Sequence, residues 1–364
     1  MAEAKKVESI PKVNKKKEVT ADINDNSIDK FFHQNSPINN EMVRNEVLNE
    51  LYPQEVDGQS QIVPTEVTVK KSKGKSAAVR TLCSFSYDDN VDIEKLNKSG
   101  RFRITGYDRR VYNAVGTLWL SGKKKMTLTE IFAIMNGYAK ANPAEVQLQK
   151  IENSLYKLSS IVAYIDFTEE VKKNTLKNKD ALVEAGILKN NTDEIKKAVI
   201  KDNMLHFSVG IIESEQGKVY RNFNIIGTPC VLAYNIAKNS IISIPIEYIG
   251  LRNTSATEKS ISFQDYLLMR IINYKQGKME QNIIKYDTLY RDSGVKLPTK
   301  PDSRSSDRKL VETIMDEFVE KGLLIGYEKI KKGRTPVGIK FYVSNDEELE
   351  SEDIAEITAE NIDE

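Results

Sequence analysis

Candidate catalytic residues in this chain are isolated from one another. The segment Lys73-Gly74-Lys75-Ser76 has the last residues of a phosphate-binding loop. The full pattern Gly-x-x-x-x-Gly-Lys-Ser requires a further glycine where this chain has Val69, and a strand before the loop. No strand is expected there, so the sequence does not favour an NTPase.

Histidine chemistry is equally restricted, because the chain has only His33 and His206, far apart in the sequence. His206 has no second histidine two residues away, which excludes the His-hydrophobe-His metal pair of rolling-circle nicking enzymes. We therefore interpret both side chains as structural or exposed, and expect no histidine-based metal site.

The carboxylates also lack neighbouring residues that would make a catalytic or metal site. Asp88, Asp89 and Asp92 could hold a metal ion as in a primase, but a polar turn explains them better. Asp166 follows an apolar run and is interpreted as a strand end. Sixteen tyrosines leave a tyrosine nucleophile open, although no base or metal cluster accompanies one. We expect no enzymatic activity, no metal and no cofactor.

Basic side chains in the C-terminal third indicate a different chemistry. A helix is predicted over residues 303–321, and Arg304, Ser305 and Arg308 lie in its first turns. Acidic residues follow further along, at Glu312, Asp316, Glu317 and Glu320. This order opposes the helix dipole, which favours acids first and bases last. Since the N-terminal end of a recognition helix enters the major groove, we interpret the first turns as DNA-binding; the alternative is an ordinary solvated face.

A basic hairpin is expected after that helix, with strands over Ile325–Ile330 and Pro336–Val343 and a glycine in the turn between them. Its basic residues are Lys329, Lys331, Lys332 and Arg334. Such a hairpin can follow the phosphate backbone, which positions a protein without reading sequence. Residues 259–345 have 17 basic and 11 acidic side chains, a net charge of +6.

An earlier stretch has a similar order of elements. Helices are expected over about 108–120, after the capping-box pattern Thr127–Glu130, and over about 144–159, with a strand following at Ile161–Ile165. The third helix has an apolar stripe at Leu148, Ile151, Leu155 and Leu158, and a polar stripe at Gln147, Lys150, Ser154 and Lys157. The candidate DNA contacts of this stretch are Gln147, Lys150, Lys157, Lys123, Lys124 and Lys125. Arg109 and Arg110 are counted among its other basic groups.

The fold class expected from these patterns is α+β, with two tandem winged helix-turn-helix domains, the first carrying an added β-sheet. The β-rich stretch 204–247 is interpreted as the wing and the added sheet of the first domain, and 250–259 as a linker. The expected divisions are a largely disordered basic and polar N-terminal region (1–98), a first domain (100–250) with a charged insertion (171–202), a second domain (259–345) and an acidic tail (346–364). A short helix around Asn40–Leu51 is a further expectation.

Charge is segregated along the chain. The segment from Asp346 to the C-terminus has ten Asp or Glu residues and no Lys or Arg, so residues 1–345 carry +11 although the whole chain carries +1. A basic body with an acidic tail indicates a polyanionic partner; a tail that only aids solubility is the alternative.

The compartment is inferred from what the sequence lacks. No apolar run approaches the roughly 20 residues that cross a bilayer, and no secretory signal is visible. Cys83 and Cys230 are too few for a disulfide framework or a four-ligand zinc site. We expect a cytoplasmic protein without membrane partners.

Three segments of the earlier stretch carry a resemblance to a known family. They are Tyr107-Asp-Arg-Arg-Val-Tyr-Asn-Ala-Val-Gly-Thr-Leu-Trp119, Met126-Thr-Leu-Thr-Glu-Ile-Phe132 and Ile151-Glu-Asn-Ser-Leu-Tyr-Lys-Leu158. Together with the order of elements over about 100–345, they resemble the dual winged-helix plasmid replication initiators that bind repeated origin sites. The long N-terminal region and the 171–202 insertion depart from the compact form of that family.

The resemblance implies a non-enzymatic initiator that binds double-stranded DNA. The second domain would read the major groove, and the first would add contacts and mediate a homodimer in equilibrium with monomer. Host proteins, such as a helicase or an initiator, would be partners. A transcriptional repressor with two winged-helix domains and a structural or partition DNA-binding protein remain alternatives. Direct repeats beside an A·T-rich stretch near the gene would favour initiation, and one inverted repeat at a promoter would favour repression.

Overall fold

The computed structural model describes residues 28–36, 38–39, 42, 54–56, 59–61, 82–87, 104–138, 143–189, 195–215 and 219–343. The phosphate-loop-like segment, the three clustered aspartates, most of the Asn40–Leu51 stretch and the acidic tail lie outside these residues. The protein has a mixed helix and strand architecture.

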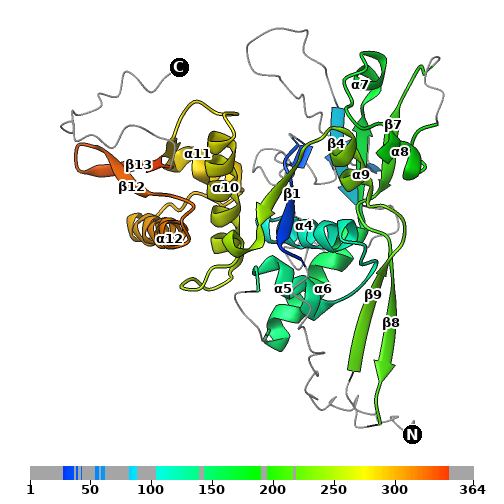
Figure 1. Cartoon of the computed structure of the whole chain (residues 1–364), viewed down its shortest axis with the longest axis horizontal. Coiled ribbons are helices and arrows are strands. Elements are labelled where there is room, and N and C mark those ends of the chain that lie inside the picture. The colour runs from blue at the N-terminus through cyan, green and yellow to red at the C-terminus, as the bar shows by residue number, and fades with distance from the viewer. Residues whose placement is uncertain are drawn as a thin grey trace, which may run out of the picture.

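The described chain contains two units in which the same six elements follow one another: helix, strand, helix, helix and a two-stranded hairpin (Figure 1). The first unit consists of α4 (Gly106–Leu120), β5 (Lys125–Thr127), α5 (Leu128–Met135), α6 (Glu145–Ser159), β8 (Phe207–Glu213) and β9 (Val219–Ile225). The second unit consists of α10 (Glu258–Lys275), β11 (Ile283–Lys285), α11 (Tyr286–Ser293), α12 (Pro301–Glu320), β12 (Gly326–Lys332) and β13 (Thr335–Tyr342). Their sheets have the equivalent strand orders β5-β9-β8 and β11-β13-β12.

Local sequence explains where the helices of the first unit begin and how they pack. Thr127 and Glu130 form the predicted capping box, in which each side chain accepts a hydrogen bond from the other residue's backbone N–H. The predicted apolar stripe of α6 is fully inside the unit: Leu148 is 6% exposed, and Ile151, Leu155 and Leu158 are 0% exposed. Burial of this stripe against α4 and α5 fixes which face of α6 remains at the surface.

An inserted sheet separates α6 from its hairpin. The strand predicted after α6 is present as β6 (Ile161–Asp166), but it does not pair with the hairpin: it lies between β4 (Leu82–Tyr87) and β7 (Val199–Asn203) in an antiparallel sheet. Alternate residues of β6 are buried, which holds one face of this sheet on the core. The short helices α7 (Thr168–Lys172) and α8 (Asp180–Glu184) lie between β6 and β7.

The expected added sheet over 204–247 is thus differently built. Only β8 and β9 form the hairpin, whereas β10 (Ile241–Pro245), which follows α9 (Cys230–Ala237), pairs with β1 (Lys30–Gln34). The 3₁₀ helix η1 (Ile246–Tyr248) follows β10, and β2 (Gln54–Val56) pairs with β3 (Gln59–Gln61).

Strand β1 comes from the region that the sequence predicts to be largely disordered. It pairs along its full length with β10, and Phe31 is 0% exposed. His33 is also buried, with Nδ1 3.2 Å from the Asn113 side-chain nitrogen of α4. Burial lowers the pKa of His33 to about 3, because the imidazolium would lose its hydration there. Residues 28–36 are therefore part of the fold, and His33 is a neutral structural side chain.

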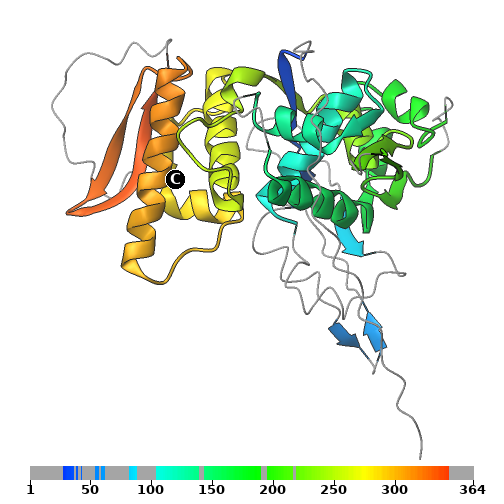
Figure 2. The same cartoon turned by 90° about the horizontal axis from the view of Figure 1, so that it is seen from below.

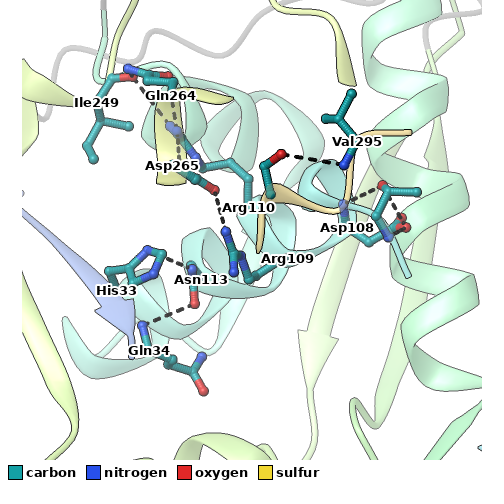
Figure 3. A network of polar contacts seen from close by, with 12 residues as sticks. His33, Gln34, Asp108, Arg109, Arg110, Asn113, Ile249, Gln264, Asp265 and Val295 are labelled. Carbon is teal, nitrogen blue, oxygen red and sulfur yellow. Dashed lines mark hydrogen bonds and ion pairs between the residues drawn. The ribbon is translucent and has the colours of Figure 1, made fainter. Parts of the chain in front are cut away.

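The two units meet through a buried polar contact between α4 and α10 (Figure 3). The Arg110 guanidinium of α4 donates to the carboxylate of Asp265 and, at 3.0 Å, to Oε1 of Gln264. It also donates to the carbonyl oxygens of Met135, at 2.9 Å, and Ile249, at 3.3 Å. One side chain therefore links α4, the end of α5, the inter-unit segment and α10.

The contact leaves little free space and little compensating charge. A Cβ atom at Gly106, the first residue of α4, would collide with the Ser262 hydroxyl of α10. Arg109 is buried as well, and its nearest carboxylate oxygen is the second oxygen of Asp265 at 4.0 Å. Two guanidinium groups thus share one carboxylate, and burial lowers the pKa of Arg109.

The segment predicted to be a linker is held by the second unit. Glu317 of α12 is 1% exposed, and its carboxylate accepts from the backbone N–H groups of Arg252, at 2.7 Å, and Asn253, at 2.9 Å. Lys321 donates to the carbonyl oxygen of Glu247 at 2.7 Å. Figure 2 shows the second unit, in yellow to red, directly beside the first, in cyan to green. These contacts join the units at a defined relative position.

Candidate nucleic-acid interface

The two arginines predicted to read bases from α12 have partners within the protein. Arg304 is partly buried, and its Nε donates to the carbonyl oxygen of Pro298 at 2.7 Å. The Arg308 guanidinium lies 5.5 Å from the centre of the Tyr286 ring of α11. Ser305 is exposed, as is Lys309 one turn later. Neither arginine is among the exposed residues at the start of α12, which are Pro301, Asp302, Ser305, Ser306 and Lys309.

Several acidic residues of α12 also have partners within the protein. Glu312 pairs with Lys329 of β12 at 2.9 Å, and Asp316 accepts from the Tyr327 hydroxyl at 2.8 Å. Glu317 holds the inter-unit segment, as described above. Three of the four late acids of this helix therefore have partners within the fold, so the order of its charges is a weaker indication of DNA than the sequence suggests.

The hairpin of the second unit presents basic groups at its tip. Lys331, Lys332 and Arg334 are exposed, and the turn between the strands consists of Gly333 and Arg334. Gly333 has φ of +60°, a conformation that glycine adopts readily in two-residue hairpin turns. Lys329 lies further from the tip and pairs with Glu312. Three of the four predicted hairpin residues are thus placed to meet an external anion.

The polar stripe predicted on α6 is divided between the surface and the interior. Lys157 is ion-paired with Asp108 of α4 at 2.7 Å, and Ser154 donates to the same carboxylate at 2.6 Å. Gln147 accepts from the Ala144 backbone N–H at 2.9 Å and so caps the helix. Of the predicted stripe, only Lys150 is exposed without such a role.

The exposed face of α6 is instead rotated from the predicted one. Its exposed residues are Glu145 at the start of the helix and Val146, Gln149, Lys150, Asn153 and Tyr156, and we call the last five the α6 ridge. These positions follow one another at helical spacing, so they lie on one face. The sequence did contain a signal for it: this face is the one opposite the apolar stripe.

The lysines before α5 are only partly available. Lys123 pairs with Glu130 at 3.1 Å, and the Lys124 ammonium lies 5.2 Å from the centre of the Trp119 ring. Lys125 is exposed at the start of β5. Arg109 and Arg110, counted as basic groups of this unit from the sequence, are buried between the units and do not contribute to its surface charge.

Other kinds of site find no support in the part of the chain that the structure describes. Among these residues, no three His, Cys, Asp or Glu side chains are grouped to hold a metal ion. None of the described helices has both the length and the apolar character needed to span a membrane.

The solved structures to which this chain is similar include two of the same protein. One, a crystal structure of RctB domains 2-3, has a TM-score of 0.39 and 10% identity, over 77% of this chain and 90% of that chain. The other, a selenomethionine derivative of domains 2 and 3 of RctB, has a TM-score of 0.35 and 10% identity, over 76% and 91%. No family model matches the chain, and no curated protein matches it.

Proposed function

We propose that this protein is a non-enzymatic replication initiator that binds specific double-stranded DNA through two winged-helix domains, the first and second units. The observation that carries the proposal is the repeated order of elements, each time ending in a helix with an exposed face followed by a hairpin. In this arrangement the third helix, α6 or α12, enters the major groove and the hairpin follows the adjacent phosphates.

The charge distribution supports a polyanionic partner. Lys331, Lys332 and Arg334 form an exposed basic tip on one hairpin. The α6 ridge carries Lys150 between two amide side chains, Gln149 and Asn153. Phosphate contacts from the basic hairpin tip would position the protein. Base-edge contacts from the amides of the α6 ridge would select a sequence.

The proposal is tested with the full chain and overlapping duplexes that cover the DNA beside its gene. We expect selective binding to some of these duplexes in the absence of Mg²⁺ and nucleotide, relative to shuffled duplexes of the same composition. Protection of several direct repeats is expected for an initiator, and protection of one inverted repeat at a promoter would make it a repressor. Metal-dependent nicking or ATP turnover that survives repurification would overturn the non-enzymatic assignment.

We further propose that the chain forms a homodimer through the hairpin of the first unit. Among the described strands, β8 is at the edge of its sheet, and Ile211 and Ile212 on it are 65% and 59% exposed. Exposed edges with apolar side chains favour pairing with another chain. In Figure 1 this hairpin extends away from the helices of its unit.

For the dimer, we expect sedimentation of the full chain at tens of micromolar to give a monomer–dimer equilibrium. Changing Ile211 and Ile212 together to Asp should shift it to monomer by at least tenfold in the dissociation constant, about 1.4 kcal/mol. The same double change at exposed Ile325 and Leu297 of the second unit is the control. If the parent chain sediments only as a monomer, the dimer proposal is wrong, while the proposal of DNA binding is unaffected.

A further inference from the structure

We infer that the α6 ridge of the first unit reads adenine-containing base pairs in the major groove through Gln149 and Asn153. The inference rests on the proposed DNA binding and assigns the principal base reading to the first unit. The sequence alone assigned it to Arg304 and Arg308 of the second.

The fold leaves this ridge uncovered. The opposite side of α6 is packed by Leu148, Ile151 and Leu155, which are 6% exposed or less. No described element covers Val146, which is 68% exposed. An exposed, apolar, β-branched side chain at the start of a recognition helix could contact a thymine methyl group in the major groove.

The amides on the ridge have the hydrogen-bonding pattern that adenine requires. Gln149 and Asn153 are one turn apart, and Gln149 Nε2 donates weakly to Asn153 Oδ1, at 3.5 Å. Gln149 Nε2 also donates to Glu152 at 3.3 Å, so the described bonds leave Gln149 Oε1 and Asn153 Nδ2 available. Between them, the two side chains can match adenine: Gln149 Oε1 can accept from the N6 amino group, and Asn153 Nδ2 can donate to N7.

The charges beside the two amides are balanced, because Lys150 is exposed on the ridge and the exposed acid Glu145 lies one turn before Gln149. Glu152, the acid nearest to the two amides in sequence, is 8% exposed and pairs with Arg221 of β9 at 3.1 Å. Its charge is therefore compensated by Arg221, and the same carboxylate oxygen accepts the Gln149 amide at 3.3 Å. Lys150 adds an exposed positive charge, whereas the later part of α12 exposes the acids Asp316 and Glu320.

Tyr156 connects the ridge to the hairpin. It is 48% exposed, and its ring lies edge-on to Phe207 of β8 at 5.5 Å and to Phe223 of β9 at 6.4 Å. These contacts hold the end of α6 against the hairpin strands. The amides are therefore carried on a helix whose position relative to the hairpin is fixed, as reading of base edges requires.

The test is selection of bound duplexes from a random pool with the full chain, followed by affinity measurements on the selected site. We expect the parent to select at least one A·T pair that Gln149→Ala or Asn153→Ala no longer selects. Each change should weaken binding to the selected site by about 5- to 150-fold, while binding to shuffled duplexes changes by less than about twofold. Gln276→Ala, which removes an exposed amide from the end of α10, is the matched control and should change neither.

The DNA side provides a second measurement. Replacing the selected adenine by 7-deazaadenine removes its N7 acceptor, and should weaken parent binding as much as the matching alanine change does. Combining that alanine change with the modified base should cost no more than either alone. Thermal unfolding of both variants should match the parent, because the two side chains are exposed.

The outcomes separate the inference from the proposed function. If the parent selects a site and both alanine variants keep the same base preference, the inference is wrong while DNA binding stands. If the parent shows no preference among duplexes, the proposed function itself fails.

Discussion

Replacing Arg110 by alanine is expected to lower the free energy of unfolding by about 3–5 kcal/mol. The guanidinium is 1% exposed and provides the nearest positive charge to Asp265, so its loss leaves that carboxylate with only Arg109, at 4.0 Å. The variant also leaves the carbonyl oxygens of Met135 and Ile249 without this donor. Urea unfolding followed by circular dichroism measures the change.

Arg291→Ala is the control for this experiment, because Arg291 is half exposed and pairs with the adjacent Asp292. Exposed ion pairs contribute about 1 kcal/mol or less, so this variant should remain close to the parent. If Arg110→Ala lowers the free energy of unfolding by less than about 1 kcal/mol, the buried contact between the units does not stabilise the fold as we expect.

Replacing Lys331, Lys332 and Arg334 together by alanine is expected to give the largest change in DNA binding. Each phosphate contact releases counterions, so the slope of log K against log salt concentration should fall by roughly 0.9 per lost contact, up to about 2.7. Affinity for specific and shuffled duplexes should fall by the same factor. Titrations at several salt concentrations give both quantities.

The comparison variants are Arg304→Ala and Arg308→Ala. Because both side chains have partners within the protein, we expect either change to leave the salt slope nearly unchanged; a base preference relaxed by about 1–3 kcal/mol at one position would show that the arginine also reads guanine. If the hairpin variant keeps the parent slope and Arg304→Ala loses it, the roles of helix and hairpin have been exchanged. If neither set matters, the second unit does not contact DNA.

Elements set by local sequence could be predicted well. The capping box at Thr127 and Glu130 and the apolar stripe of α6 depend on residues within a few positions of each other, and both are present. The basic hairpin was also predictable, because a glycine turn between two strand-like runs is a short-range signal.

Contacts between distant residues could not be predicted in the same way. The polar stripe predicted on α6 included Lys157 as a DNA contact, but Lys157 pairs with Asp108 on another helix. Arg110 looks like a surface residue until α10 is packed against it, and Lys329 is basic in sequence but paired in the fold. Strand β1 pairs with β10, about two hundred residues later, and no periodic pattern in the sequence indicates that pairing.

The buried junction between α4 and α10 has a consequence for the DNA as well as for the protein. With Arg110, Glu317 and Lys321 holding the units together, α6 and α12 have one separation and one relative angle. Two proposed DNA-binding helices held in this way would require a fixed length and rotational phase of duplex between their contacts, since each helical turn of about 10–10.5 base pairs returns the same groove to the same side. In the proposed complex the two DNA segments therefore form one site of fixed spacing, and half a turn of added DNA would place one segment on the far side of the helix, beyond reach of the second unit.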